Sequence, residues 1–246
     1  MAKRMAWLLP VLACLFCGCD VLDEALTSER IQGSGKVVQE NRDVNGFNEV
    51  NFAGSGELNL QQGNKESLTV AADDNLLPYI RTEVSGGKLV IGIQRGVSVS
   101  PSKPIRYTLV VRTLDALELS GSGKTRAGPL HSGDFSVHLS GSGDIVMEAL
   151  DAATLEADIS GSGNMEILGK VGRQRIQISG SGRYDAPDLE CQTADVSVSG
   201  SGESVLWVRE SLSAHISGSG SVRYYGSPSV TRKVSGSGSI RNLGNR

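Results

Sequence analysis

A recurring Gly-Ser-Gly triplet constrains the fold of this chain more than any other feature of its sequence. Nine copies begin at residues 33, 54, 121, 141, 161, 180, 200, 218 and 236, and seven of the eight spacings lie between 18 and 21 residues. A flexible Gly/Ser linker has neither such a period nor apolar flanks. The triplet therefore marks a structural repeat, which also explains why 31 of the 246 residues are glycine.

Apolar and polar residues alternate on both sides of the triplets. Leu155 and Ile159 precede Gly161 in one phase, and Gly163 and Met165 continue it. A period of two predicts β-strands with one buried face. Because the glycines fall on the buried phase, they predict a corner at which the strand bends and no Cβ fits, while the serines point outward.

A unit of about 20 residues with two or three short strands is typical of a β-helix, whose coils bury their apolar faces by stacking. A propeller blade is about twice as long, and the leucine-rich repeat signature is absent. The sequence therefore predicts an all-β solenoid in which outward residues form ladders spaced by about 4.8 Å. One predicted ladder is Lys124, Asp144, Asn164, Arg183, Glu203, Ser221 and Ser239, and a second is Glu118, His138, Asp158, Gln177, Ser197, His215 and Lys233.

The long stretch between the triplets at 54 and 121 interrupts the period. Residues 58–60, 67–70, 88–91 and 107–111 read as strands, and residues 73–79 read as a helical turn or loop between coils. Since the stretch is slightly longer than three periods, we expect it to continue the same solenoid without the glycine corner.

The N-terminus has the pattern of a secretory signal. Lys3 and Arg4 precede an apolar run over residues 5–16, which is too short to span a bilayer. The run ends at Gly18-Cys19, which resembles the cleavage and acylation site of bacterial lipoproteins. We predict a lipoprotein signal peptide over residues 1–18, a lipidated tether over 19–30 with acylation at Cys19, and a β-helix domain over 31–246.

Two alternatives at the N-terminus stay open. Val11-Leu12-Ala13-Cys14 is a competing acylation site that leaves a shorter signal, and a plain cleaved signal without lipid is the other. Cleavage before Cys19 leaves Cys191 as the only thiol available to the domain, so no intramolecular disulfide can form. Packing and hydrogen bonds must then stabilise the domain.

Several segments resemble a known family. They are Gly-Phe-Asn-Glu-Val at 46–50, the run Ala-Asp-Asp-Asn-Leu-Leu-Pro-Tyr-Ile at 72–80, and residues 82–89, 117–123 and 225–228. Together they resemble the head GIN domain proteins, a family of bacterial envelope lipoproteins described as putative autotransporter adhesins. The resemblance implies a single-stranded right-handed parallel β-helix, and it implies no catalytic residues.

The sequence has no strong signal for binding nucleic acids, nucleotides or metals. A net charge of −3 disfavours a nucleic-acid binder, which needs a basic face. Residues 120–125 look like the end of a phosphate-binding loop, but Glu118 stands where that motif needs glycine. His138 and His215 share a ladder about four coils apart, roughly 19 Å, too far to share a zinc ion. We therefore predict no metal and no cofactor.

Catalysis and sugar binding are the alternatives to a structural role. Asp134, Asp144, Glu148 and Asp158 are the acids that would have to converge in a polysaccharide lyase or hydrolase, and charges on a solvated face are the simpler interpretation. Trp207 and Tyr225 are the best members of a sugar-stacking strip, against core or corner packing. The alternatives are therefore a carbohydrate-binding module and, less favoured, a polysaccharide-acting enzyme.

The predicted function is accordingly that of a non-catalytic cell-envelope lipoprotein whose β-helix acts as a structural or adhesive surface. Its predicted partners are membrane lipid, through acylated Cys19, and an envelope glycan or protein. The predicted place is the bacterial cell envelope, lipid-anchored, facing the periplasm or the exterior.

Overall fold

The computed structural model describes residues 29–246, which form strands, turns and one short 3-10 helix, η1 (Leu77–Tyr79). No helix in this part of the chain is long and apolar enough to cross a membrane. The predicted signal peptide, the acylation site Cys19 and the competing Cys14 lie outside the described residues. Strand β1 begins at Glu29, so the last two residues of the predicted tether belong to a strand.

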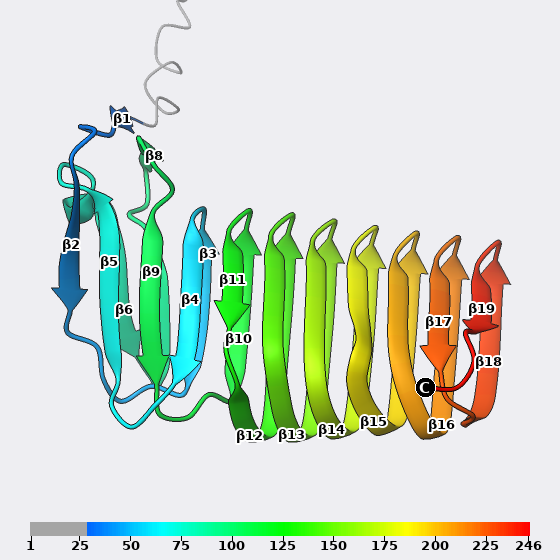
Figure 1. The fold of residues 1–246 in the computed structure, drawn as a ribbon. Coiled ribbons are helices and arrows are strands. Elements are labelled where there is room, and N and C mark those ends of the chain that lie inside the picture. Colours follow the sequence, from blue (N-terminus) through cyan, green and yellow to red (C-terminus); the bar gives the residue numbers. More distant parts are fainter. Residues whose placement is uncertain (1–28) are drawn as a thin grey trace, which may run out of the picture.

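From residue 116 onward the chain forms stacked coils, each paired in parallel with the next (Figure 1). Leu117 pairs with Val137 and Val137 pairs with Ala157, so one coil corresponds to one period of the sequence repeat. The predicted fold, an all-β parallel β-helix with about 20 residues per coil, is therefore confirmed. The strands are β10 (Ala116–Gly121), β11 (Lys124–Ala127), β12 (Leu130–Gly141), β13 (Asp144–Gly161), β14 (Asn164–Gly180), β15 (Arg183–Gly200), β16 (Glu203–Gly218), β17 (Ser221–Tyr225), β18 (Ser229–Gly236) and β19 (Ser239–Asn242).

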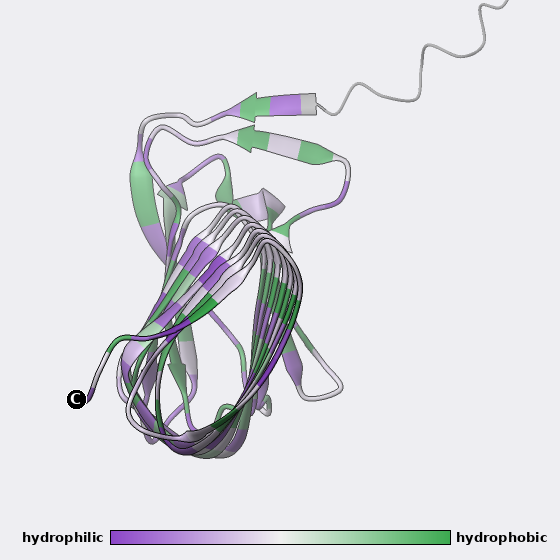
Figure 2. Cartoon of the chain, turned by 90° about the vertical axis from the view of Figure 1, so that its right-hand side faces the viewer, coloured by the Kyte–Doolittle hydropathy of each residue, from purple (hydrophilic) through white to green (hydrophobic). Residues whose placement is uncertain are grey.

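The core of the solenoid consists mainly of aliphatic side chains stacked from coil to coil. Viewed along the axis, the coils superpose into one closed outline (Figure 2). A fully buried Leu or Ile contributes about 1.5–3 kcal/mol relative to an exposed one, so such stacks stabilise the fold without many aromatic residues. One of them, before the glycine corner, is Leu119, Leu139, Ile159, Ile178, Val198 and Ile216.

The glycine corners have two separate physical causes. Gly161 has a φ of +124°, and a Cβ on it would lie within 3.0 Å of the Gly141 carbonyl oxygen in the preceding coil. Gly163 is buried, and a Cβ there would press on the Gly143 backbone and the Leu139 side chain. The corner therefore needs one glycine for its backbone angle and close stacking, and a second for space. The phase of the sequence predicts the buried position of Gly163, whereas Gly161 is only half-buried.

A hydrogen-bonded polar cluster around Gln174 interrupts the apolar core. The buried Gln174 side chain accepts a hydrogen bond from the Tyr184 hydroxyl at 2.8 Å and donates to the Cys191 sulfur at 2.9 Å. Cys191 is a free, buried thiol, and burial raises its pKa to about 11. Because each member has a partner, the network does not leave Gln174 unsatisfied in the core.

The N-terminal end bears out only part of the prediction that the 54–121 segment continues the solenoid. Strands β3 (Glu49–Gly54) and β4 (Glu57–Gln62) lie directly beside β10 and β11, with Gly54 opposite Gly121. The intervening strands lie on the far side of β3 and β4. They are β5 (Ser67–Asp73), β6 (Ile80–Ser85), β7 (Lys88–Ile93), β8 (Val97–Ser100) and β9 (Arg106–Val111). Strands β7 and β9 pair in parallel with β3 and β4 and so continue the stack, whereas β5 and β6 do not.

The reason is a reversal of the chain. Gly86 and Gly87 have φ values of +59° and +80°, which suits a tight hairpin turn between β6 and β7. The strand β6 thus pairs antiparallel with β7, and β5 pairs antiparallel with β9. Strand β2 (Val37–Arg42) pairs antiparallel with β5, and these antiparallel strands close the N-terminal end of the solenoid.

The triplet at residue 33 is not a corner of the repeat, which is a second correction. The Gly35 amide and the Ser102 amide each donate a 2.8 Å hydrogen bond to the buried carboxylate of Asp73, and the Ser102 hydroxyl donates one of 2.6 Å. These bonds, the Ser102 hydroxyl above all, lower the pKa of Asp73. The triplet and Ser102 therefore form a clasp around Asp73, next to the small parallel pair of β1 (Glu29–Gln32) with β8.

Candidate functional site

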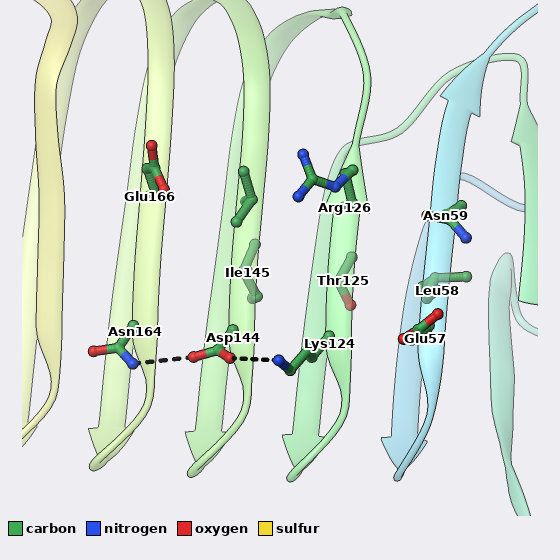
Figure 3. A pocket seen from close by; sticks show the side chains of 11 residues that line it. Glu57, Leu58, Asn59, Lys124, Thr125, Arg126, Asp144, Ile145, Asn164 and Glu166 are labelled. Carbon is green, nitrogen blue, oxygen red and sulfur yellow. Dashed lines mark hydrogen bonds and ion pairs between the residues drawn. The ribbon is translucent and has the colours of Figure 1, made fainter. Parts of the chain in front are cut away.

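A shallow trough crosses four neighbouring strands of the solenoid, β4, β11, β13 and β14, just after the glycine corner (Figure 3). It has a volume of about 420 Å³ and runs along the solenoid axis. Its floor is the backbone around three inward residues, Leu58, Thr125 and Ile145. Its two walls are ladders of outward side chains: Glu57, Lys124, Asp144 and Asn164 on one side, and Asn59, Arg126, Val146 and Glu166 on the other.

The stacking register positions these side chains. Lys124 pairs with Asp144 and Asp144 with Asn164, as the sequence ladder predicts. Residues two positions further on form the second wall because strand neighbours alternate between the two faces. The same register therefore aligns Arg126, Val146 and Glu166, although these residues are not part of the predicted ladders.

Ion pairs and an amide fix the first wall. Asp144 accepts a hydrogen bond from the Asn164 amide at 3.0 Å and lies 3.8 Å from the Lys124 ammonium nitrogen. At the end of this wall, Arg106 lies 3.1 Å from the Glu57 carboxylate. All of these groups are partly exposed, so each pair contributes only about 0–1 kcal/mol to stability. Their effect is to hold the polar atoms in fixed places.

The second wall is less paired. Arg126 reaches out to Glu148 at 3.1 Å, which directs its guanidinium along the same coil face. Glu166 makes no hydrogen bond or ion pair with any residue between 29 and 246. The trough thus presents carboxylates, amides and cations to solvent over four coils. Such a surface can bind an extended polar ligand through hydrogen bonds and weak ion pairs.

The structure separates the acids considered for catalysis. Asp134 accepts a 2.6 Å hydrogen bond from the hydroxyl of Thr154, and Asp158 lies 3.0 Å from His138. Asp144 and Glu148 belong to the ion pairs of the trough. Each of the four acids has its own partner, so they do not converge on one point. This arrangement matches the interpretation of charges on a solvated face.

The histidines lie apart as the ladder predicts. His138 and His215 occupy the same ladder with three rungs between them, and His131 lies on another, 3.3 Å from Asp151. Within residues 29–246 no group of three or more His, Cys, Asp or Glu side chains is arranged to hold a metal ion.

The two aromatic residues considered for sugar stacking are neighbours. Trp207 pairs with Tyr225 on the adjacent coil, and both side chains are half-buried. The guanidinium carbon of Arg246 lies 5.2 Å from the centre of the Tyr225 ring, which places a cation over that ring. Tyr184 and Tyr224, in contrast, are buried, as their phase predicts.

Two residues of the trough could not be predicted from the sequence. Glu57 and Asn59 come from β4, which is far from β11 along the chain, and only the observed pairing brings them beside Lys124 and Arg126. The predicted ladder therefore began at Lys124, one rung too late.

The chain matches a known protein family and several solved structures. The family model described as "Putative auto-transporter adhesin, head GIN domain" matches residues 46–228. No curated protein matches the chain. Among solved structures, the chain is similar to a putative adhesin from Bacteroides fragilis, with 24% identity and a TM-score of 0.81 over 87% of this chain and 100% of that one.

Two further structures are similar over the same share of the chain. A putative lipid binding protein from Parabacteroides distasonis is 26% identical, with a TM-score of 0.75 over 87% of this chain and 100% of that one. A putative adhesin from Parabacteroides merdae is 22% identical, with a TM-score of 0.72 over 87% of this chain and 99% of that one.

Proposed function

Because the chain belongs to the head GIN domain family of putative auto-transporter adhesins, we propose that it is a non-catalytic adhesive protein of the bacterial cell envelope, held by lipid on Cys19. The family match confirms the resemblance predicted from residues 46–50, 72–80, 82–89, 117–123 and 225–228. It supports an adhesin-like surface protein. The lipid anchor and the adhesive site are the parts that we propose.

The trough is the observation that carries the adhesive role. It is an open surface built from four rigid, in-register coils, and its walls present polar side chains at the spacing of the strands. An adhesin needs a preformed surface rather than a deep pocket, because rigid contact groups lose little entropy on binding. A repeating surface also suits a ligand that itself repeats.

The anchor follows from the N-terminal sequence. Strand β1 begins ten residues after Cys19. Ten residues reach at most about 33–36 Å, so an acylated Cys19 would keep the solenoid close to its membrane. The protein would face the periplasm or the exterior.

A charge reversal in the trough tests the adhesive site. We expect Glu166→Arg to weaken adhesion of cells that display the protein, because it adds a long cation to the second wall. The matched control is Glu156→Arg, the same change at an exposed residue on another face of the same solenoid. Equal adhesion of wild type and both variants would show that the trough is not the contact surface.

A carbohydrate-binding module is the second candidate function. It is favoured by the amides of Asn59 and Asn164 and the carboxylate of Glu166, which are the groups that recognise sugar hydroxyls. A glycan array probed with wild type and Glu166→Arg identifies this ligand class. New reducing or unsaturated ends after incubation with polysaccharides would instead reveal an enzyme and contradict the non-catalytic proposal.

A further inference from the structure

Charge is segregated along the axis of the solenoid. Residues 116–210 contain seven basic and 14 acidic residues, a net charge of −7. Residues 211–246 contain five basic residues and no acidic one. Because coils follow one another along the axis from β12 to β19, this change in sequence is also a change in space (Figure 1). The acidic middle ends in a basic tip.

The cations of the tip divide into paired and unpaired ones. Arg223 lies 3.4 Å from Glu203, which is already 3.3 Å from Arg183, and Arg246 pairs with Asp188. The other three basic side chains, Arg232, Lys233 and Arg241, are exposed and form no ion pair within residues 29–246. We call these three residues the basic tip.

The geometry of the last coil gathers these charges at its end. Lys233 and Arg241 are outward residues, one on each side of the final glycine corner, and Arg241 lies next to Arg223. Arg232 pairs with Ala214, a buried inward position, so it lies over the end of the core, where it donates a 3.1 Å hydrogen bond to the Tyr224 hydroxyl. The three cations therefore surround one end of the solenoid.

The backbone adds donors to the same end. Strand β18 pairs only with β16, and β19 only with β17, among the described strands. One side of each strand therefore carries unpaired N–H and C=O groups. N–H groups beside guanidinium and ammonium groups are hydrogen-bond donors for an anion.

We propose that the basic tip binds an anionic polysaccharide, through carboxylate or sulfate groups along its chain. The inference rests on the proposed adhesive function and assigns a second contact surface to it. A lipid surface is disfavoured because Val37 and Val234 are the only large apolar side chains exposed in residues 29–246, and they lie on strands at opposite ends of the solenoid. A stiff nucleic-acid duplex would lie along the acidic coils, which repel it.

Binding to immobilised polymers at low salt tests the proposal. The probes are heparin for sulfate, polygalacturonate for carboxylate and dextran as the uncharged control. We expect binding to at least one of the charged polymers, none to dextran, and a steep loss on raising NaCl. The triple variant Arg232→Gln, Lys233→Gln, Arg241→Gln should bind about tenfold more weakly, because it removes the charges that displace counterions.

A matched triple variant distinguishes an effect of the basic tip on binding from an effect of the overall net charge. Lys65→Gln, Arg95→Gln, Lys103→Gln removes the same charge from exposed loops at the other end of the solenoid, and should bind within twofold of wild type. Equal weakening of both triple variants would overturn the proposal. So would binding to anionic lipid vesicles or duplex DNA in place of the polysaccharides, or no binding to any charged polymer.

The tip and the trough can fail independently. Glu166→Arg changes the trough and leaves the basic tip intact. If this variant loses adhesion but binds the polymers as wild type does, only the trough is responsible for the lost adhesion. If the tip variant loses polymer binding and keeps its thermal melting temperature, the basic tip itself is responsible for polymer binding. If the tip variant has a lowered melting temperature, the single variant Lys233→Gln is tested instead, because the Lys233 side chain is exposed. For the proposal to stand, this single variant must weaken polymer binding at least twofold.

Discussion

Replacing Gly161 by valine tests the physical account of the corner most directly. The residue has a φ of +124°, a region that a β-branched residue very rarely adopts. A Cβ at this position would also lie within 3.0 Å of the Gly141 carbonyl oxygen. That oxygen accepts the 2.9 Å hydrogen bond from the Ser162 amide, so the new side chain has to displace a bonded backbone.

The magnitude follows from two costs. A backbone held in a sparsely populated conformation costs about 1–3 kcal/mol, and overpacking at a tight contact costs about 1–3 kcal/mol. If both apply, Gly161→Val lowers the free energy of unfolding by about 2–6 kcal/mol. Ser162 is exposed and keeps its amide after substitution, so Ser162→Val should change the free energy by no more than about 0.5 kcal/mol.

Urea denaturation of the two variants beside wild type provides the measurement. The midpoint is the quantity to compare, because a repeat solenoid need not unfold in one step. Gly236→Val should shift the midpoint less than Gly161→Val, although its Cβ meets the Gly218 carbonyl in the same way. Among the coils of residues 29–246, the last one has a neighbour on one side only, so it can move away from the new side chain.

The result that would refute this reasoning is an equal shift at residues 161 and 162. It would mean that the corner tolerates a side chain at either position, and that close stacking of the glycine backbones is not what the repeat preserves. A large effect at Ser162 alone would mean that the outward serines contribute an interaction that the corner geometry does not show.

The remaining predictions concern the anchor, the clasp and the core thiol. Cys19→Ser should release the protein from membranes and abolish fatty-acid labelling, whereas labelling that persists there and disappears in Cys14→Ser would place the lipid at Cys14. Asp73→Asn should lower the thermal melting temperature at pH 7, because an amide cannot accept from all the donors around it. Since the clasp lowers the pKa of Asp73 in the folded state, its stabilisation is complete above the ordinary carboxyl value of 3.8 and is lost as the pH falls through the folded pKa. Melting temperatures from pH 7 to pH 2 should therefore fall less in Asp73→Asn than in wild type, and parallel curves would contradict this. Cys191, with its pKa raised to about 11 by burial, should resist iodoacetamide at pH 8 in the folded protein and react once urea unfolds it, as followed by mass spectrometry.

The sequence by itself determined the repeating part of the fold. Between residues 116 and 242 every coil meets a near copy of itself, so alternation and period together specify the strands, the inward phase and the partners of each rung. The ladder from Lys124 to Ser239 and the inward position of Gly163 could be predicted because they depend only on register. One wall of the trough, except its first rung, could be predicted for the same reason.

Only the tertiary structure decided the N-terminal end and the full extent of the trough. Alternation shows that β4 and β9 are strands but not which strands they pair with, and the pairing that places Glu57 beside Lys124 joins strands far apart in the sequence. The hairpin at Gly86 reverses the chain, so the strands of the 54–121 segment close the end of the solenoid instead of extending its middle. A strand edge can pair with many partners of suitable pattern, and the choice among them depends on which arrangement buries the most apolar surface and leaves the fewest backbone groups unpaired. That balance is a property of the whole folded chain, which is why the repeat could be read from the sequence and its closure could not.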